Sequence, residues 1–182
     1  MNSLSIFLFS MASILVIHPA LALENNVSIS GNLVTEPCTL DPTASVISLD
    51  FGTVVNKYFQ TASRTPGMPF TIQLIDCDIT LGKNVTVTFG GNESTGLPGL
   101  LMPDGGSTAG LAFGIETVPN AATGSTAQPV PINQPSQVFS LSEGSSAIHL
   151  QGYIQALPDA IANNSIQSGP FIATATFQLD YP

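Results

Sequence analysis

The sequence predicts an all-β sandwich of the immunoglobulin type in a single domain. Short segments of alternating apolar and polar residues recur along the chain, and clusters of Gly, Pro, Asn and Ser separate them. No segment shows a sustained helical period with caps. The length of 182 residues suits one domain, and an apolar content of 43% is enough for a sizeable core.

The first segment predicts a secretory signal peptide over residues 1–22. The apolar run Leu4–Ile17 would span roughly 21 Å as a helix, which is short of a ~30 Å hydrocarbon core. Ala20–Ala22 offers a cleavage site before Leu23. Met1–Ser3 carries no Lys or Arg, so an uncleaved anchor is the alternative. No later stretch is long enough to cross a membrane, so we expect no membrane insertion after cleavage.

The strands predicted after the signal peptide follow in order along the chain. Asn25–Leu33 alternates, and Ile47–Phe51 alternates up to Gly52. Phe70–Leu74 alternates until Ile75 breaks the phase, which predicts a bulge. Four further strands are expected over Val85–Phe89, Leu111–Ile115, Val138–Leu141 and Ile148–Ile154.

The last predicted strand alternates up to the end of the sequence. Polar residues separate its apolar positions, which are Ala173, Ala175, Phe177, Leu179 and Tyr181. This pattern is typical of a strand with one buried face and one wet face. Only Pro182 follows, so we expect the ladder partner on one side of this strand to come from another molecule.

Two long connections, Gly90–Gly110 and Val118–Gln137, are rich in Gly, Pro, Asn, Ser and Thr. Connections of this length are uncommon in compact domains. They are either binding loops or decorated edges. The second interpretation is favoured, because neither segment concentrates the aromatic or charged residues of binding loops.

Export determines how the two cysteines are interpreted. In an oxidising compartment, Cys38 and Cys77 are most simply one disulfide, which would contribute roughly 3–4 kcal/mol in the chain-entropy model. No C-x-x-C motif occurs, and His149 is the only histidine after the signal peptide. We therefore expect neither a metal nor another cofactor.

The charge balance argues against two classes of partner, nucleic acid and anionic membrane. The net charge is −9, with three basic side chains against twelve acids. Nucleic-acid binding needs clustered Lys and Arg, and docking on an anionic membrane needs a basic surface. A soluble acidic exterior is the simplest meaning of the charge.

A loose strand at the start of the exported chain complements the last strand. In Leu23–Leu33, the positions that share one side are Val27, Ile29, Gly31 and Leu33. The exported chain thus has a strand that lacks a neighbour at its C-terminal end and a loose strand at its N-terminal end. Together these are the two halves of a head-to-tail contact. Such a contact forms an open filament when it does not close into a ring.

Several motifs occur in a fixed order behind the signal peptide. They are Val27–Leu33 before Cys38, Leu49–Gly52, Pro69–Leu74 before Cys77, Gly169, the alternating Ala173–Asp180 and the penultimate Tyr181. With these motifs the chain resembles chaperone–usher pilus subunits, close to the type 1 fimbrial subunits of Gram-negative bacteria. The resemblance covers essentially all of the chain after the signal peptide.

The resemblance implies an incomplete immunoglobulin-like sandwich that lacks its last strand and is completed in trans by donor-strand complementation. Residues 23–36 would be the donor-strand extension, with Val27, Ile29 and Leu33 as knobs and Gly31 at a shallow pocket. Residues 37–182 would be the pilin domain. The residues expected to line its acceptor groove and contact the chaperone are Gly169, Ala173, Ala175, Phe177, Leu179, Tyr181 and Pro182.

The resemblance also implies partners and a location. A periplasmic chaperone would lend a strand and hold the carboxylate on Pro182, and an outer-membrane usher would exchange that strand for a neighbouring subunit's extension. The chain would pass through the periplasm to a fimbrium at the cell surface and support cell adhesion. Whether the neighbours are copies or siblings is open, as is the choice between a major rod subunit and a minor tip or adaptor subunit.

The sequence leaves two other classes of function to consider, an enzyme and an adhesin. An enzyme is disfavoured, because the G-x-S-x-G motif is absent, Ser107 has no linked base, and Asp76 and Asp78 suit a polar strand end. The better alternative is a single-domain secreted carbohydrate-binding adhesin that uses the two long connections. The absence of Trp disfavours a sugar-stacking platform, and tip adhesins carry a separate binding domain and no free donor strand.

Overall fold

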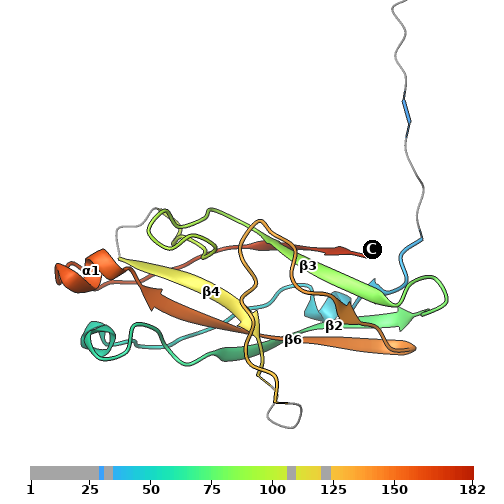
Figure 1. Cartoon of the computed structure of the whole chain (residues 1–182), viewed down its shortest axis with the longest axis horizontal. Helices are drawn as coiled ribbons and strands as arrows, with labels where there is room; N and C mark the ends of the chain where they lie inside the picture. Colours follow the sequence, from blue (N-terminus) through green and yellow to red (C-terminus); the bar gives the residue numbers. More distant parts are fainter. Residues whose placement is uncertain (1–28, 31–34, 106–109, 120–123) are drawn as a thin grey trace, which may run out of the picture. The chain divides into compact units, whose positions relative to one another are not determined.

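The computed structural model describes residues 29–30, 35–105, 110–119 and 124–182 (Figure 1). The chain divides into two units, residues 1–33 and residues 34–182. All described helices and strands belong to the second unit, and none of these helices is long and apolar enough to cross a membrane. The predicted signal peptide, residues 1–22, lies outside the described residues.

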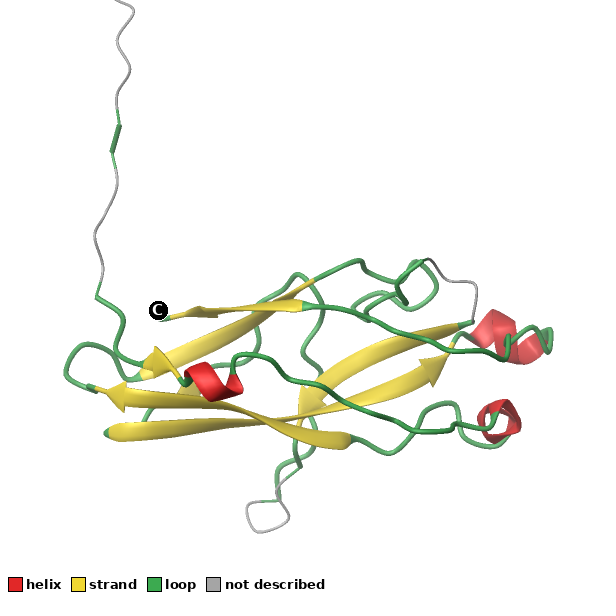
Figure 2. Ribbon diagram, turned by 180° about the vertical axis from the view of Figure 1, so that it is seen from behind, coloured by secondary structure: helices red, strands yellow, loops and turns green. Residues whose placement is uncertain are grey.

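The strands form two antiparallel sheets, which confirms the predicted all-β fold. The first sheet has the order β1-β2-β6-β4, with β1 at Thr39–Leu40, β2 at Met68–Cys77, β6 at Gly144–Ala156 and β4 at Leu111–Thr117. The second sheet has the order β5-β3-β7, with β5 at Phe139–Ser140, β3 at Asn84–Gly90 and β7 at Thr176–Asp180. Figures 1 and 2 show β3 and β7 together on one side of β2 and β6.

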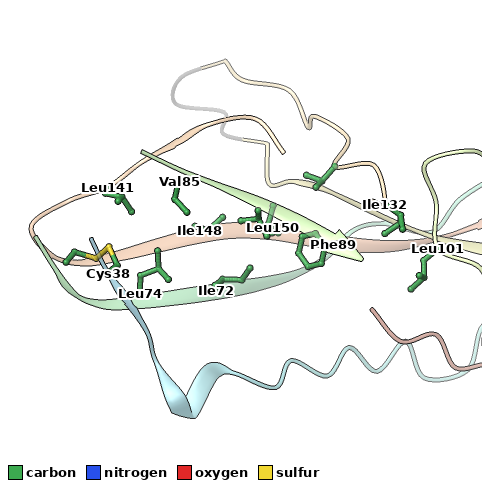
Figure 3. Close-up of a cluster of buried hydrophobic side chains, with 13 residues drawn as sticks. Cys38, Ile72, Leu74, Val85, Phe89, Leu101, Ile132, Leu141, Ile148 and Leu150 are labelled. Atoms are coloured by element: carbon green, nitrogen blue, oxygen red, sulfur yellow. A yellow bond between two sulfur atoms is a disulfide. The ribbon is translucent and has the colours of Figure 1, made fainter. Parts of the chain in front are cut away.

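The core lies between the two sheets (Figure 3). Alternate side chains of β2, β3 and β6 point inward and are almost completely buried, among them Ile72, Leu74, Val85, Val87, Ile148 and Leu150. Each such side chain contributes roughly 1.5–3 kcal/mol by leaving water. The strand predictions over these three segments are confirmed, as are those over β4 and β5.

The predicted disulfide between Cys38 and Cys77 is present, and both residues are buried. It joins the residue before β1 to the last residue of β2. The register of β2 against β6 shifts between Ile75 and Cys77, and Asp76 has a φ of 51°. The phase break at Ile75 therefore marks a bulge, as predicted, with the extra residue one position further along.

The described parts of the two long connections supply core residues. Leu101 comes from the first, and Val130 and Ile132 come from the second, with exposures of 6%, 1% and 0%. The second connection also follows β3, because the N–H groups of Asn133 and Ser136 donate to β3 carbonyls at 2.7 and 2.8 Å. These connections are part of the sandwich, which neither sequence-based interpretation included.

Helical structure is confined to short turns in the described residues. They are η1 at Pro42–Ala44, η2 at Asn56–Gln60 and α1 at Pro158–Ala162. A helix of five residues is too short to produce a periodic pattern. These three short helices were therefore not predictable from the sequence pattern.

The prediction of a strand over Ile47–Phe51 is wrong. The segment has no ladder partner in the described part of the chain. Its alternation is nevertheless real, since Ile47, Leu49 and Phe51 are half-buried and the two residues between them are exposed. Alternation reports which face is buried, whereas a strand also needs a hydrogen-bonding neighbour.

Two further strand predictions differ from the structure in extent. The last strand begins at Thr176 rather than Ala173, because the preceding residues have no ladder pairing with β3. Most of the predicted strand over Asn25–Leu33 lies outside the described residues. Its two described members, Ile29 and Ser30, have no regular secondary structure, and both are exposed.

Candidate functional site

The C-terminal strand has a hydrogen-bonded neighbour on one side only. β7 pairs with β3, in a register that places Phe177 opposite Phe89, and β7 is the last strand of its sheet. Figure 2 shows this strand leading to the marked C-terminus. An unpaired strand edge is a template for another strand.

The inward residues of this C-terminal segment are only half-buried. Exposure alternates from Phe171 to Leu179, and the half-buried apolar positions are Phe171, Ala173, Ala175, Phe177, Leu179 and Tyr181. All six pack against the core clusters. On the neighbouring strand, Val85 and Val87 are fully buried. The inward side chains of the C-terminal segment are therefore less completely covered than those of the neighbouring strand β3.

Residues 47–54 form a second incompletely covered segment. Ile47, Phe51 and Val54 pack against the core clusters but stay half-buried. The backbone of residues 47–54 makes no backbone hydrogen bond to another described residue. Residues 47–54 and 171–181, with the aromatic floor described next, are called the open edge below.

Glycine at position 152 allows residues 47–54 to approach the first sheet. A Cβ at Gly152 of β6 would lie 2.7 Å from Cδ1 of Leu49, which is closer than real contacts allow. Leu49 therefore occupies the space above this glycine. This contact holds the segment against the sheet without ladder hydrogen bonds.

Aromatic rings form the floor of the open edge. Phe113 lies 5.6 Å from Phe171, measured between ring centroids, and Phe89 lies 6.1 Å from Phe177 and 6.3 Å from Phe70. Phe70 and Phe113 are half-buried, although both point toward the core. The floor of the open edge therefore leaves aromatic surface partly exposed.

Hydrogen bonds close the open edge at the end nearest Phe171. The side-chain amide of Asn56 donates to the Ile166 carbonyl and the Ser168 hydroxyl, each at 3.4 Å. The amide of Gln60 donates to Oδ1 of Asn164 at 3.0 Å. These bonds connect η2, which follows residues 47–54, to the segment that precedes residue 171. We call this set the polar clamp.

The opposite end of the open edge lies against the disulfide. The Tyr181 hydroxyl donates to the Cys38 carbonyl at 3.4 Å. Burial raises the pKa of the Tyr181 phenol, and the nearby Glu36 carboxylate adds to this effect. The last residues of the chain thus lie beside Cys38 and the start of β1.

The predicted site residues are distributed as follows. The five predicted apolar positions from Ala173 to Tyr181 share one inward side of the C-terminal segment. Pro182 is exposed, and Gly169 has a φ of 154° with open space around it. Ile29 is 93% exposed. Val27, Gly31 and Leu33 lie outside the described residues.

Sequence reasoning missed several residues of the open edge. Phe171 has the same parity as Ala173, so the alternation could have been extended by one step. Ile47 and Phe51 were expected in a strand but not at the site. Phe70 and Phe113 could not be found this way, because only the fold brings their partly exposed rings beside Phe171 and Phe177.

An ionic cluster occupies the outer face of the first sheet. Arg64 pairs with Glu116 through both guanidinium nitrogens, and the Gln151 amide also donates to Glu116 at 2.7 Å. The Arg64 guanidinium stacks 3.7 Å from the centroid of the Tyr153 ring. Bonding to Arg64 lowers the pKa of the Glu116 carboxyl. Every group has a partner, which is typical of a structural cluster.

The described residues contain no cluster of three or more His, Cys, Asp or Glu side chains that could hold a metal. His149 lies on the exposed outer side of β6, where its Nδ1 is 3.1 Å from the Thr71 hydroxyl. The open edge is the feature of the described domain that stands out as unfinished.

Comparison with known proteins gives consistent results for sequence and structure. The family model described as fimbrial protein matches residues 27–182. The fimbrial adapter PapK of Escherichia coli is 29% identical over 162 residues, which are 88% of this chain and 89% of PapK. The crystal structure of the P pilus rod subunit PapA is similar with a TM-score of 0.67 at 22% identity, and covers 81% of this chain and 100% of that chain. A chaperone–usher pilus structure has a TM-score of 0.66 at 22% identity, and covers 87% of this chain and 96% of that chain.

Proposed function

This chain belongs to the fimbrial protein family, and we propose that it is a pilus subunit whose open edge accepts a strand from a neighbouring subunit. The observation that carries the proposal is the open edge itself. The inward-facing side chains of residues 47–54 and 171–181 are half-buried. Residues 47–54 have no backbone hydrogen-bonded neighbour among the described residues, and β7 has one on one side only. One extended segment bound there would complete both.

The binding mode is β-augmentation. The backbone of the incoming strand would pair with the free side of β7, and its alternate side chains would cover the rings of Phe70, Phe113 and Phe177. Ladder hydrogen bonds contribute roughly 0.5–1.5 kcal/mol each, and each fully buried apolar side chain contributes about 1.5–3 kcal/mol. The side-chain alternation fixes the register, because a shift by one residue would turn every apolar side chain away.

The proposed donor is the extension at residues 23–36 of another subunit. Val27, Ile29 and Leu33 would be the side chains that enter the open edge, and Gly31 would pass a point with no room for a side chain. The pilin domain would comprise residues 37–182. Each subunit would act as the donor in one contact and as the acceptor in the next. The contact is therefore head-to-tail and extends into a filament.

Export and assembly require two further partners. The chain passes through the periplasm to the pilus at the cell surface, and we infer that a periplasmic chaperone covers the open edge until an outer-membrane usher allows the exchange. The exposed Pro182 carries the C-terminal carboxylate, which a basic site on the chaperone would hold. The supported function is therefore structural, in a pilus that mediates cell adhesion.

Thermal unfolding of the mature chain, residues 23–182, with added peptides tests this proposal. A peptide of residues 23–33 at 100 times its Kd should stabilise the fold by about 2.7 kcal/mol. For a chain of this size, the midpoint should then rise by about 5–10 °C. A control peptide with the same composition, but with its apolar and polar positions exchanged, should have no effect.

The outcomes separate the possible neighbours. A gain with the chain's own peptide indicates subunits that join copies of themselves, and a gain only with extension peptides of other fimbrial subunits indicates an adaptor. If no such peptide raises the midpoint, the open edge is not an acceptor and the proposal is wrong.

Substitution of Gly31 tests the donor assignment. We expect a Gly31→Leu peptide to bind at least about tenfold more weakly, because forcing a side chain into a packed site costs roughly 1–3 kcal/mol. A Ser30→Leu peptide is the matched control, since position 30 would point away from the acceptor. Equal affinities for the Gly31→Leu peptide and the unmodified peptide would refute the assignment.

A further inference from the structure

A polar hollow with one positive charge lies at the clamped end of the open edge. It has a volume of about 250 Å³ and is lined by Asn56, Lys57, Gln60, Asn164 and Ile166. Lys57 is the only charged residue in this lining. Among the basic residues of the described chain, Arg64 has an ion-pair partner, whereas Lys57 has none. The site therefore offers a cation without a bound anion.

The direction of the incoming strand determines what reaches this hollow. Both sheets of the domain are antiparallel throughout. An occupant that continues this arrangement runs antiparallel to β7 and makes the more stable ladder. Its C-terminal end then lies beside Phe171, which is the end closed by the polar clamp.

A carboxylate follows shortly after the donor segment. Glu36 comes three residues after Leu33, a distance of roughly 10 Å in an extended chain. Glu36 is exposed, and no described basic residue pairs with it. When Leu33 of one subunit lies near Phe171 of another, Glu36 of the first subunit is therefore within reach of the second subunit's polar hollow.

We propose that Lys57 and the polar clamp form a second binding site, which receives the Glu36 carboxylate of the neighbouring subunit. This inference rests on the proposed function, and it takes a second copy of this chain as the partner. Lys57 supplies the charge, while the Gln60 amide, which uses one of its two N–H groups in the clamp, supplies a further donor. The contact would set where the donor stops, because Glu36 meets Lys57 only in one register.

A double-mutant cycle on peptide release tests the pairing. The acceptor is the mature chain or its Lys57→Gln variant, and the ligand is an amidated peptide of residues 23–37 or its Glu36→Gln variant. Each single change should speed release about two- to fivefold at low salt, as expected for a partly exposed ion pair. The double change should be no faster than either single change. Salt at 1 M should remove the difference in release rate between the variants and the unmodified pair.

Lys83 provides the matched control and also tests the direction of the donor. It follows Gly82, whose position abuts the Pro37 ring at the opposite end of the domain. A Lys83→Gln acceptor should release the peptide at the unchanged rate. Coupling between Glu36 and Lys83 in place of Lys57 would show a parallel donor and overturn the proposal.

Failure of this inference differs from failure of the proposed function. If the peptide of residues 23–33 stabilises the chain but Glu36 and Lys57 act independently, the second site is wrong and the open edge still binds a donor. If only the extension peptide of another fimbrial subunit stabilises the chain, the second copy assumed here is wrong and the open edge still binds a donor. If no extension peptide stabilises the chain, the proposed function has failed first.

Discussion

Of the carboxylates in the described residues, Glu116 is the most completely buried, and it lies outside the open edge. Glu116 is 6% exposed, and the two nitrogens of Arg64 and the amide of Gln151 bind its oxygens. Gly114 is also required there, since a Cβ at that position would lie 2.1 Å from Cζ of Tyr153. The cluster fixes the outer face of β4 and β6, and so keeps the first sheet rigid beneath the aromatic floor.

Replacement of the buried carboxylate should destabilise the domain. We expect Glu116→Gln to lower the free energy of unfolding at pH 7 by about 1–3 kcal/mol, because a charged hydrogen bond is lost. The lower part of this range is favoured, since the Arg64 side chain is 38% exposed. Chemical denaturation of the mature chain measures the difference.

The same variant should change the response to acid. Bonding to Arg64 holds the pKa of Glu116 below its ordinary value of 4.5, so the carboxylate stabilises the fold fully above that pH. This stabilisation is lost as the pH falls through the lower pKa of the folded state. The difference between wild type and Glu116→Gln should therefore shrink below about pH 4.5. An exposed Asp159→Asn substitution serves as the control, and a difference that is constant from neutral pH to acid would contradict this account.

At the scale of elements, the C-terminal segment has two faces with different roles. Phe177 is half-buried and contacts Phe89, whereas Ile172 is 69% exposed and points away from the core. A completed edge would bury Phe177 further and would leave Ile172 unchanged. The loss of unfolding free energy on truncating Phe177 should therefore depend on whether the donor is bound, whereas the loss on truncating Ile172 should not.

We predict that Phe177→Ala destabilises the donor-bound domain more than the free domain. Complete burial makes the loss about 3–5 kcal/mol, and partial burial in the free domain makes it smaller. Ile172→Ala should have the same small effect in both states. Denaturation of each variant with and without the peptide of residues 23–33 gives the four values. Equal losses for Phe177→Ala in the two states would show that the donor does not cover this ring.

The elements also show how far the sequence could predict the fold. Period-two alternation identified the strands β2, β3, β4 and β6, because both faces of those strands have distinct environments. It identified the inward side of Ile47–Phe51 correctly and its hydrogen bonding wrongly. The alternation of apolar and polar residues is the same whether or not a segment has a hydrogen-bonded neighbour. The sequence therefore could not distinguish a paired strand from an unpaired one.

The candidate site was predictable on one side only. The C-terminal side was predictable because the alternation of apolar and polar residues is visible in the sequence itself. The aromatic floor and the polar clamp were not, because they join residues far apart in the chain, such as Asn56 and Ser168. The contributions of Leu101 and Ile132 to the core were equally hidden, because both lie in segments with the composition of loops. Such contacts follow from the fold as a whole rather than from any local pattern.

At the scale of the whole molecule, the disulfide holds the start of the second unit in place. Cys38 lies before β1, its carbonyl accepts from Tyr181, and its partner Cys77 closes β2. The bond therefore holds the first residues of the domain beside the end of the C-terminal segment.

Removal of the disulfide should weaken the whole fold. For a sequence separation of 39 residues, we expect the double variant Cys38→Ser and Cys77→Ser to lose about 3–4 kcal/mol of unfolding free energy. The loss should be the same with and without donor peptide, because the open edge does not include the sulfur atoms. A variant as stable as wild type would show that hydrophobic packing alone positions β1.

Hydrogen exchange of the mature chain, with and without the donor peptide, tests the central claim most directly. In the free chain, the amides of residues 47–54 and the amides of residues 172–180 that point away from β3 should exchange quickly, while β2 and β6 stay protected. Saturation with a donor peptide should protect both segments together. If both segments of the free chain are already as protected as β6, the edge is closed without a partner, and the account of this protein as a strand acceptor is contradicted.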